Sequence, residues 1–303
     1  MKHPIAKISA LTAAILAATP ALAGGFDNSS RGFDIIYGDN SVISTSYGQT
    51  TVPMKAQIQQ GAGNSSSVVA SGEIIDDFNR PQMGFRYQVA NGITCAAQFE
   101  RPFAAKVTYK DDSLAYGSET APISTKYESE SFTVACGYDF ALSTGKIKVF
   151  GGPKIQKVKG AFDEDLSTAA AGSSDNLDVQ LDGGSEFGYT LGAAYEIPEY
   201  ALRASILYHS QIDYSADGQL SAVLPTGTAF TTDATAKTFT PQTIELGFQS
   251  GLADNTLAFL KMRWSEYSKL AELQVNGDTS TTVNGNSLAM IEAQATQQTN
   301  QQR

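Results

Sequence analysis

Side chains that could carry out chemistry are scarce in this sequence. Of the two histidines, His209 is the one that lies beyond the N-terminal segment, so a Cys/His metal site or a histidine-based triad is hard to build. No G-x-S-x-G motif occurs, and the glycine-rich GGPKIQKVKG (151–160) continues as a strand where a phosphate loop would begin a helix. We therefore expect no catalytic residues, no metal site, no cofactor and no enzymatic activity.

Two further groups of residues could bind or cross-link. The acidic stretches KDDS (110–113) and AFDEDLS (161–167) could hold a divalent ion, but solvated loop charge is the interpretation that we favour. Cys95 and Cys136 could form a disulfide in an oxidising compartment, or they could be two small apolar residues on a strand surface. The residues alone leave both alternatives open.

Residues 1–23 have the features of a secretory signal peptide. Lys2 and Lys7 precede an apolar run from Ile8 to Ala18, and Ala21-Leu22-Ala23 supplies small residues at the expected cleavage site. The run is shorter than the roughly 20 residues of a spanning helix, which argues against a membrane anchor. Without these two lysines the 21 basic residues become 19 against 31 acidic ones, so the net charge changes from −10 to −12. Such a charge argues against nucleic acid as a partner.

Beyond residue 23, apolar and polar residues alternate with a period of two. In FTVACGYDF, one face carries Phe132, Val134, Cys136, Tyr138 and Phe140. The opposite face of this stretch is small or polar, and EFGYTLGAAYE (186–196) repeats the contrast. Such alternation is typical of a transmembrane barrel with a lipid-facing outside and a lumen-facing inside, in which neighbouring strands satisfy each other's backbone groups.

Short and long connections also alternate along the chain. Short turns are expected at Asn91-Gly92, Ser143-Thr144-Gly145, Pro198-Glu199 and Ala253-Asp254-Asn255, and long polar stretches at 110–127, 160–184 and 215–238. Outer-membrane barrels show this alternation of connection lengths, with short periplasmic turns and long external loops. We therefore predict an all-β, antiparallel outer-membrane barrel over residues 41–271. The nine expected strands are 41–57, 77–90, 93–109, 127–141, 146–159, 184–196, 200–214, 240–251 and 256–268. Closed single-chain bacterial barrels have even numbers of strands, so nine indicates an incomplete barrel.

The last expected strand, TLAFLKMRWSEYS (256–268), changes its alternation midway. Its initial parity would turn Lys261 and Arg263 toward lipid, at roughly 2–4 kcal/mol each near the membrane midplane. A β-bulge would reset the parity and turn both cations into the lumen, with Leu260, Met262 and Trp264 facing lipid. In the alternative, the parity is kept and Leu260 and Met262 line an apolar channel. The residues expected to line the lumen are Arg203, His209, Glu245, Lys261 and Arg263.

Residues 24–40 precede the first alternating strand. Their apolar side chains need a surface to bury against, so we expect this segment to lie inside the barrel as a plug. The alternative is a disordered exported tail, given the Gly and Ser content. The expected plug residues are Phe26, Arg31, Phe33, Ile35 and Ile36.

Three stretches together resemble the FadL/TodX group of outer-membrane transporters for long-chain fatty acids and aromatic hydrocarbons. GGFDNSSRGFDIIYGD (24–39) is similar to the plug segment of that group, and ITCAAQFERPFAAKVTY (93–109) to its third strand. FTPQTIELGFQSGLADNTLAFLKMRWSEYS (239–268) is the most specific stretch, with a Gly-Phe strand, a short turn, Thr-Leu and Arg-Trp. The resemblance implies a barrel of about fourteen strands that transports hydrophobic molecules.

The sequence departs from this group in two places. The Asn-Pro-Ala that often follows the plug in this group is absent. The polar end EAQATQQTNQQR (292–303), within the tail 272–303, has no terminal Phe where the group continues with further strands. We therefore expect a truncated member that does not close a stable barrel alone, because an unclosed sheet in lipid leaves edge N–H and C=O groups unsatisfied.

QFERPFAAK (98–106) contains a proline in the middle of an expected strand. Pro102 has no N–H to donate, and Arg101 would face lipid if the strand ran on regularly. A kink that turns Arg101 inward would open the wall. The resemblance implies that the third strand carries a lateral gate, and the matching residues here are Phe99, Arg101, Pro102 and Phe103. In the alternative, Pro102 lies at the outer rim, where the strand ends.

The resemblance implies passive transport of hydrophobic small molecules through a plugged barrel with sideways exit. A porin for polar solutes and a soluble secreted β-sandwich are the alternatives. The expected location is the outer membrane of a Gram-negative bacterium. The expected partners are a hydrophobic substrate, outer-membrane lipid with lipopolysaccharide, and the barrel-insertion machinery.

Overall fold

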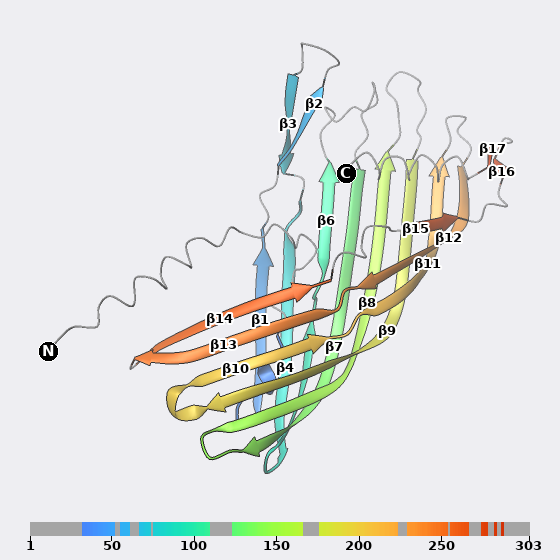
Figure 1. The fold of residues 1–303 in the computed structure, drawn as a ribbon. Helices are drawn as coiled ribbons and strands as arrows, with labels where there is room; N and C mark the ends of the chain where they lie inside the picture. Colours follow the sequence, from blue (N-terminus) through green and yellow to red (C-terminus); the bar gives the residue numbers. More distant parts are fainter. Residues whose placement is uncertain are drawn as a thin grey trace.

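A computed structural model describes the chain over eleven ranges of residues. These ranges are 32–51, 55–60, 67–73, 75–109, 123–165, 176–223, 229–253, 255–266, 274–277, 282–283 and 286–287. Most strands belong to one 13-stranded sheet with the path β1-β4-β5-β7-β8-β9-β10-β13-β14 (Figure 1). The strands of this path are β1 (Val42–Thr50), β4 (Phe78–Ala90), β5 (Ile93–Glu100), β7 (Ile123–Ala141), β8 (Lys146–Asp165), β9 (Asn176–Ile197), β10 (Leu202–His209), β13 (Thr243–Ala253) and β14 (Thr256–Ser265).

The remaining elements branch from this path or stand apart from it. In the main sheet, β6 pairs with β7, β11 with β9 and β12, and β15 with β12. Two small sheets pair β2 with β3 and β16 with β17. These elements are β6 (Ala104–Tyr109), β11 (Ile212–Val223), β12 (Ala229–Thr240), β15 (Gln274–Gly277), β2 (Lys55–Gln60), β3 (Ser67–Glu73), β16 (Thr282–Val283), β17 (Asn286–Ser287) and the 3₁₀ turns η2 (Asp34–Ile36) and η3 (Pro198–Tyr200).

The predicted all-β antiparallel architecture is confirmed. The sheet curls strongly toward the end where the short turns lie (Figure 1). Its path ends in β1 and β14, and the two are not paired with each other in the described part of the chain. The fold is therefore a curled, open sheet with one concave inner face and one convex outer face.

Two of the three predicted long loops are largely strand. Over 160–184, β8 continues to Asp165 and β9 begins at Asn176. Over 215–238, β11 and β12 form an antiparallel hairpin from Ile212↔Thr240 to Val223↔Ala229. The prediction was wrong because small residues such as Ala216 and Ala234 alternate with Thr, Ser and Asp here, which gives little hydropathy contrast. Two other predicted strands, 93–109 and 200–214, are each divided in two, as β5 and β6 and as β10 and β11.

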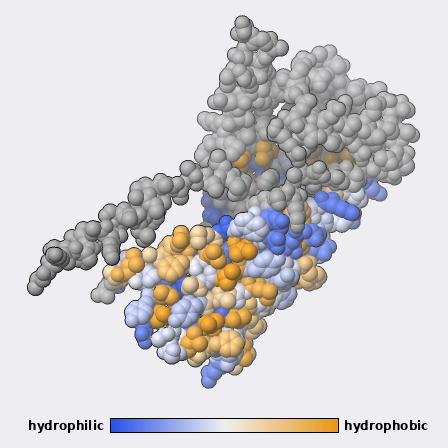
Figure 2. Space-filling view, viewed as in Figure 1, coloured by the Kyte–Doolittle hydropathy of each residue, from blue (hydrophilic) through white to orange (hydrophobic). Residues whose placement is uncertain are grey.

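The two faces of the sheet differ as the alternation predicts. One outer row runs across four strands through the register pairs Phe99↔Phe132, Phe132↔Ile155 and Ile155↔Phe187. The inner-face neighbours Thr133 and Gln156 are buried. Orange side chains gather over the lower, short-turn part of the sheet (Figure 2). The apolar side chains make this outer surface the part suited to contact with hydrocarbon. The ladder also supplies the inter-strand partner that every backbone group of a spanning strand needs there.

The predicted β-bulge in the last strand is wrong. Over its described residues, β14 keeps one register with β13 from Thr243↔Ser265 to Gly251↔Leu257, and the shift lies at the turn, between Gly251 and Ala253. Partners in register share a face, so Lys261 and Arg263 lie on the inner face together with Phe259. Phe259 is 76% exposed, because β14 is an edge of the described sheet and its inner face is uncovered there.

The alternative prediction, in which Leu260 and Met262 line a channel, is also wrong. Leu260 pairs with Phe248 and Met262 with Leu246, and all four side chains are exposed on the outer face. Trp264 pairs with Ile244 on the same face. The cations therefore avoid the apolar face without any change of parity, since the apolar residues that begin the strand are the ones that turn inward.

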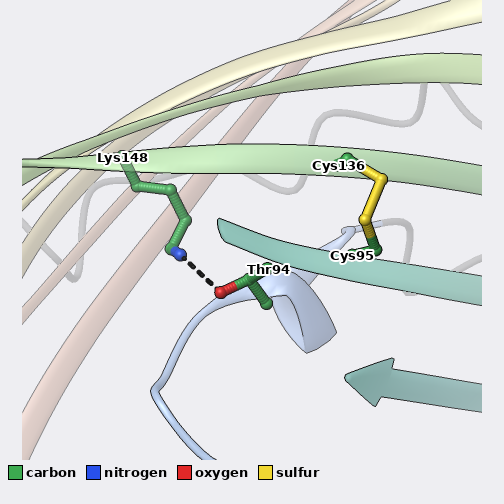
Figure 3. Close-up of a disulfide and its surroundings, with 4 residues drawn as sticks. All are labelled: Thr94, Cys95, Cys136 and Lys148. Carbon is green, nitrogen blue, oxygen red and sulfur yellow. Dashed lines mark hydrogen bonds between the residues drawn. A yellow bond between two sulfur atoms is a disulfide. The ribbon is translucent and has the colours of Figure 1, made fainter. Parts of the chain in front are cut away.

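Cys95 and Cys136 form a disulfide, which decides between the two alternatives left open by the sequence. The two residues are register partners on β5 and β7, with Cα atoms 4.0 Å apart (Figure 3). They continue the outer face that also carries Phe99 and Phe132. The covalent link joins two strands that are already neighbours in the wall.

Replacing Gly192 by Ala should weaken the fold. A Cβ at this position would lie 2.2 Å from the Phe150 Cζ atom and 2.7 Å from Cε1 and Cε2, so the buried ring must move. Overpacking of this kind costs on the order of 1–3 kcal/mol. The measurement is the temperature at which the folded, faster-migrating band of an unboiled sample disappears from a gel.

Gly160→Ala is the matched control, because a Cβ there would meet only the Lys126 carbonyl oxygen, at 3.9 Å. This variant should keep the wild-type transition. Equal transitions for both variants would contradict a tight fit of Phe150 against β9.

Candidate functional site

An N-terminal segment, residues 32–40, lies on the concave face of the sheet. Its 3₁₀ turn η2 is closed by hydrogen bonds from the Ile36 N–H to the Phe33 carbonyl (3.0 Å) and from the Tyr37 N–H to the Asp34 carbonyl (3.1 Å). Phe33, Ile36 and Tyr37 are buried, although they belong to no strand. Of the residues predicted as a plug, Phe33, Ile35 and Ile36 are thus on the inner face, while Phe26 and Arg31 lie outside the described residues.

The aromatic ring of Phe150 on β8 is the centre of this packing. Phe33 stacks on it with ring centroids 6.2 Å apart, and Tyr37 meets it edge-on at 5.8 Å. The remaining members of the same buried cluster are Ile36, Ala96, Ala135, Ala194 and Leu207, with Ile35 packed against it. The three alanines come from three strands, and their small side chains let the segment approach the wall closely.

Side chains of the wall hold the backbone of the segment. The Arg86 guanidinium donates from Nε to the Asn40 carbonyl at 2.6 Å and from a terminal nitrogen to the Ile35 carbonyl at 3.2 Å. The Gln98 amide donates to the Gly32 carbonyl at 3.0 Å. These bonds satisfy carbonyls that the irregular segment cannot pair by itself, and a buried carbonyl without a partner would be costly.

Two ion pairs tie the segment to the wall at its two ends. Asp39 accepts a hydrogen bond from the Lys146 ammonium, with 2.6 Å between Oδ1 and Nζ. Asp34 pairs with Lys261 on the edge strand β14. The segment is therefore fixed to β8 on one side and to β14 on the other.

The ammonium groups of Lys146 and Lys148 belong to a charged network on the inner face near the short turns. Lys148 is completely buried and lies 2.8 Å from Asp139 and 3.3 Å from the Thr94 hydroxyl (Figure 3). Lys146 lies 3.5 Å from both Asp139 and Glu196. Each of these two lysines therefore faces at least one carboxylate, which is the condition for keeping it charged away from water.

Two groups in the segment titrate away from their ordinary values. Burial raises the pKa of the Tyr37 hydroxyl to about 12, so it stays protonated. The Arg203 guanidinium lies over the Tyr37 ring, 4.4 Å from its centroid, and 3.6 Å from Glu196. The hydrogen bond from Lys146 lowers the pKa of Asp39, so this carboxylate is charged at neutral pH.

All five residues predicted to line the lumen lie on the inner face. Arg263 and Glu245 form an ion pair across β14 and β13, with 3.0 Å between Nε and Oε1. His209 is buried at the end of β10, beside its register partners Thr190 and Thr243. Arg203 and Lys261 take part in the contacts with the N-terminal segment described above.

The wall is irregular at Pro102. The β5–β7 ladder ends at Glu100↔Ser131, and the β6–β7 ladder begins at Ala104↔Glu128, so three residues oppose two. Ser129 closes the interval. Its hydroxyl accepts from the Phe103 N–H at 2.9 Å and donates to the Phe103 carbonyl at 3.0 Å, and its own N–H donates to the same carbonyl at 2.9 Å. Phe103 thus remains attached to β7 without a regular ladder.

On the other side of Pro102 the wall is interrupted. The β4–β5 ladder ends at Gln82↔Glu100, and the next pairing between these parts of the chain is the isolated bridge Ile75↔Val107. We call the interval between residues 77–81 and 101–105 the first seam. No ladder joins its two sides among the described residues, and each side contains a proline that lacks an N–H, Pro81 or Pro102.

The prediction that a kink turns Arg101 inward is wrong. Arg101 pairs with Glu130 at 2.7 Å. Glu130 lies two residues before the outward Phe132 on β7, and the two side chains therefore share the outer face. The side chains of Arg101 and Glu130 are about half exposed, directly above the apolar row of Phe99 and Phe132. The pair lies at the edge of the apolar surface, where a charge need not enter hydrocarbon, so no force turns Arg101 inward. The strand does not end there either, since β6 continues it.

Several residues of this site were missed at the sequence level. Pro81 could have been found, because it interrupts an alternating stretch as Pro102 does. Ser129, Arg86 and Lys146 could not, since each acts on a partner far along the chain. In the part of the chain that the structure describes, no three His, Cys, Asp or Glu side chains form a metal-binding group. No helix among those residues is long and apolar enough to cross a membrane.

A curled antiparallel sheet with an apolar outer face and an inner N-terminal segment defines a protein of the outer-membrane barrel class. The chain belongs to the family of outer membrane transport proteins called OMPP1/FadL/TodX, whose model matches residues 6–299. The resemblance seen in the sequence is thereby confirmed. This is a family of transporters and not of enzymes.

Among solved structures, the fold is similar to the crystal structure of a Pseudomonas aeruginosa FadL homologue. The TM-score is 0.56 at 14% sequence identity, and the match covers 82% of this chain and 62% of that one. The chain thus spans less than two thirds of the length of that homologue. No match was found among curated proteins.

Replacing Asp39 by Asn should loosen the N-terminal segment at neutral pH. The folded-state pKa of Asp39 lies below the ordinary 3.8, so its contribution is present above that value and is lost as the pH falls through the folded pKa. A spin label on Asn40→Cys reports this motion, because the described native cysteines are joined to each other. The label should become mobile in the wild type below pH 3.8 and be mobile already at pH 7 in Asp39→Asn.

Glu199→Gln, on the exposed turn η3, is the control and should behave as the wild type. A label that is equally immobile in the wild type and in Asp39→Asn at pH 7 would show that the Lys146 contact does not hold the segment.

Proposed function

We propose that the chain conducts hydrophobic small molecules, such as long-chain fatty acids or hydrocarbons, passively across the outer membrane. The first seam is the observation that carries this proposal. It interrupts the wall beside the inner face, on which the N-terminal segment buries Phe33 and Ile36. A molecule that cannot continue along the inner face can leave sideways there, at the upper edge of the apolar outer surface.

The proposed gate consists of Phe99, Arg101, Pro102 and Phe103 together with Pro81. Ser129 holds Phe103 on β7, so opening separates the strand of Pro102 from β4 and leaves β7 in place. The ion pair of Lys106 with Asp76, at 2.7 Å, lies at the upper end of the seam. Because this pair is partly exposed, its net contribution is small, of about 0–1 kcal/mol, and it can break during opening.

The proposed plug is the segment of residues 32–40, and it moves before a substrate passes. Its contacts with Arg86, Lys146 and Lys261 are polar and lie around an apolar centre at Phe150. An apolar substrate can replace the contacts of Phe33 with Phe150 at little cost, whereas a hydrated solute cannot. This difference supports hydrophobic molecules as the substrates, and no cofactor is needed for movement down a gradient.

The charged inner network supports the alternative, a porin for polar solutes. Lys148, Asp139 and Glu196 line the inner face, as a constriction for hydrated solutes would require. Liposome swelling separates the two functions. We expect no swelling with sugars and rapid uptake of a fluorescent fatty acid; swelling with sugars and no uptake of the lipid probe would favour the porin.

The outer surface supports outer-membrane lipid and lipopolysaccharide as the proposed partners of the protein. Exposed side chains such as Phe132, Phe187 and Leu246 contact outer-membrane lipid, and the charged row above them, with Arg101 and Glu130, lies at the level of lipopolysaccharide headgroups. Export by residues 1–23 and folding by the barrel-insertion machinery complete this proposal. The segment 1–23 lies outside the described residues.

Replacing Pro102 by Val should close the first seam. The new N–H can pair across the gap, and we expect uptake of a fluorescent fatty acid into proteoliposomes to fall at least fivefold, with the heat-modifiable gel mobility unchanged. Pro198→Val, in the exposed turn η3, is the matched control and should transport normally. Normal uptake by a well-folded Pro102→Val protein would remove the seam from the transport path.

A further inference from the structure

The wall has a second interruption, between β9 and the kinked strand formed by β10 and β11. The ladder ends at Thr190↔His209 and resumes at Asp182↔Asp217. We call the interval between residues 183–189 and 210–216 the second seam. No ladder pair joins its two sides among the described residues, although β9 remains paired with β8 over most of this length.

A mismatch of phase between the two strands explains this interruption. On β9 the extra residue lies at Gly183-Gly184, since Lys157 pairs with Ser185 and Lys159 with Asp182. On the facing strand, the inner positions change from His209 to Ile212 across the break between β10 and β11.

Between these two points the strands are one residue out of phase. Counted from Thr190↔His209, the inward Ile212 falls opposite the outward Phe187. Residues of opposite orientation cannot form ladder pairs, so the gap follows from the positions of the two irregularities.

A serine closes the lower end of the second seam. The Ser210 N–H donates to the Tyr189 carbonyl at 3.0 Å, and the Tyr189 N–H donates to the Ser210 hydroxyl at 2.9 Å. Ser129 makes the same two contacts with Phe103. A serine hydroxyl thus takes the place of a backbone carbonyl at two points of the wall, at Ser210 in the second seam and at Ser129 on the β7 side of Pro102.

Side chains, and not a ladder, cover the second seam from inside. Ile212 and Tyr214 are buried and form one cluster with Val158, against which Tyr127 packs. These side chains pack directly on glycines of β9. A Cβ at Gly188 would lie 2.7 Å from Ile212 Cγ1, and one at Gly183 would lie 2.5 Å from Val158 Cγ2. Side chains can change rotamer without breaking backbone hydrogen bonds, so this cover can open at low cost.

The outer side of the second seam faces the apolar surface. Phe187 is 71% exposed and belongs to the row of Phe99, Phe132 and Ile155. The second seam therefore reaches down into the apolar surface, whereas the first seam begins above that row. A passage at this level opens directly into the acyl chains of the bilayer.

The charges near the two seams differ. Two cations, Arg101 and Lys106, border the first seam, each in a partly exposed ion pair with a carboxylate. Two carboxylates, Glu186 and Asp213, lie close to the Tyr214 cover, and the buried Lys154 is the register partner of Gly188. The cation at the upper end, Lys157, is bound to Asp182 at 3.2 Å. With two carboxylates against one cation, the middle of the second seam disfavours a fatty-acid carboxylate and not an uncharged hydrocarbon.

We propose that the second seam is a further lateral passage, covered by Ile212 and Tyr214, that admits uncharged apolar chains and excludes carboxylates. This rests on the proposed function in so far as it assumes that hydrophobic molecules enter the lumen. Under this proposal carboxylates leave at Pro102, and neutral hydrocarbons can leave between β9 and β11.

A reversible lock across the second seam tests the proposal. In Gly188→Cys/Ile212→Cys the sulfur at position 212 takes the place of Ile212 Cγ1, 2.7 Å from a Cβ at position 188, so the two cysteines can join when oxidised. Proteoliposomes containing the double variant are given a neutral pyrene-alkane or a fluorescent fatty acid, with and without reductant. The wild type and Gly188→Cys, treated identically, control for reduction of Cys95–Cys136 and for crowding at position 188.

The expected result is that oxidation lowers alkane uptake at least fivefold and leaves fatty-acid uptake within twofold, and that reductant restores the alkane. Alkane uptake that is unchanged by the lock overturns the passage, and equal loss of both probes overturns its selectivity. If the wild type takes up neither probe, the proposed function fails. Photolabelling with a diazirine alkane, which requires no transport, still decides the inference: label at residues 212–214 in the reduced and not the oxidised variant supports it, and absence of label rejects it.

Discussion

The hydrogen-bond ladder of the wall is the constraint on which the rest of this structure depends. In hydrocarbon every N–H and C=O of a strand needs a partner, and an unsatisfied group costs several kcal/mol. The ladder is nevertheless broken beside Pro102 and beside Gly183-Gly184. Ser210 bonds to the Tyr189 backbone at the second break, and Ser129 keeps Phe103 on β7 beside the first, which limits the loss. Openings in the wall are therefore confined to short intervals with defined ends.

The inner face follows a second constraint, which is that an irregular segment in a lumen must bury its side chains and satisfy its carbonyls. Small residues on the wall, such as Ala96 and Ala194, leave the volume that Phe33 and Ile36 fill around Phe150. Arg86 and Gln98 supply the donors that a strand would otherwise provide. The apolar centre of the segment is therefore surrounded by polar contacts, which are the ion pairs with Lys146 and Lys261 and the hydrogen bonds from Arg86 and Gln98.

Period-two alternation predicted the fold class and the orientation of most strands, because burial on two different faces imposes that period. Stretches such as 160–184 and 215–238 were taken for loops, since Ala, Ser and Thr give too little contrast to reveal a strand. Pro102 marked the first seam, for proline alone lacks the N–H. The orientation of Arg101 and the role of Ser129 depend on a partner strand some 30 residues away, at Glu130 and Phe103, and no local pattern contains that information.

Photo-crosslinking during transport tests the central claim most directly. A diazirine-bearing fatty acid would be added to proteoliposomes, irradiated while uptake proceeds, and its attachment sites determined by mass spectrometry. The account predicts attachment on both sides of the first seam, at residues 77–81 and 101–105, in amounts that fall when the gradient is removed. Attachment confined to the short-turn end, at Tyr200 and Leu252, would mean that the fatty acid passes straight through the lumen, and it would contradict lateral exit.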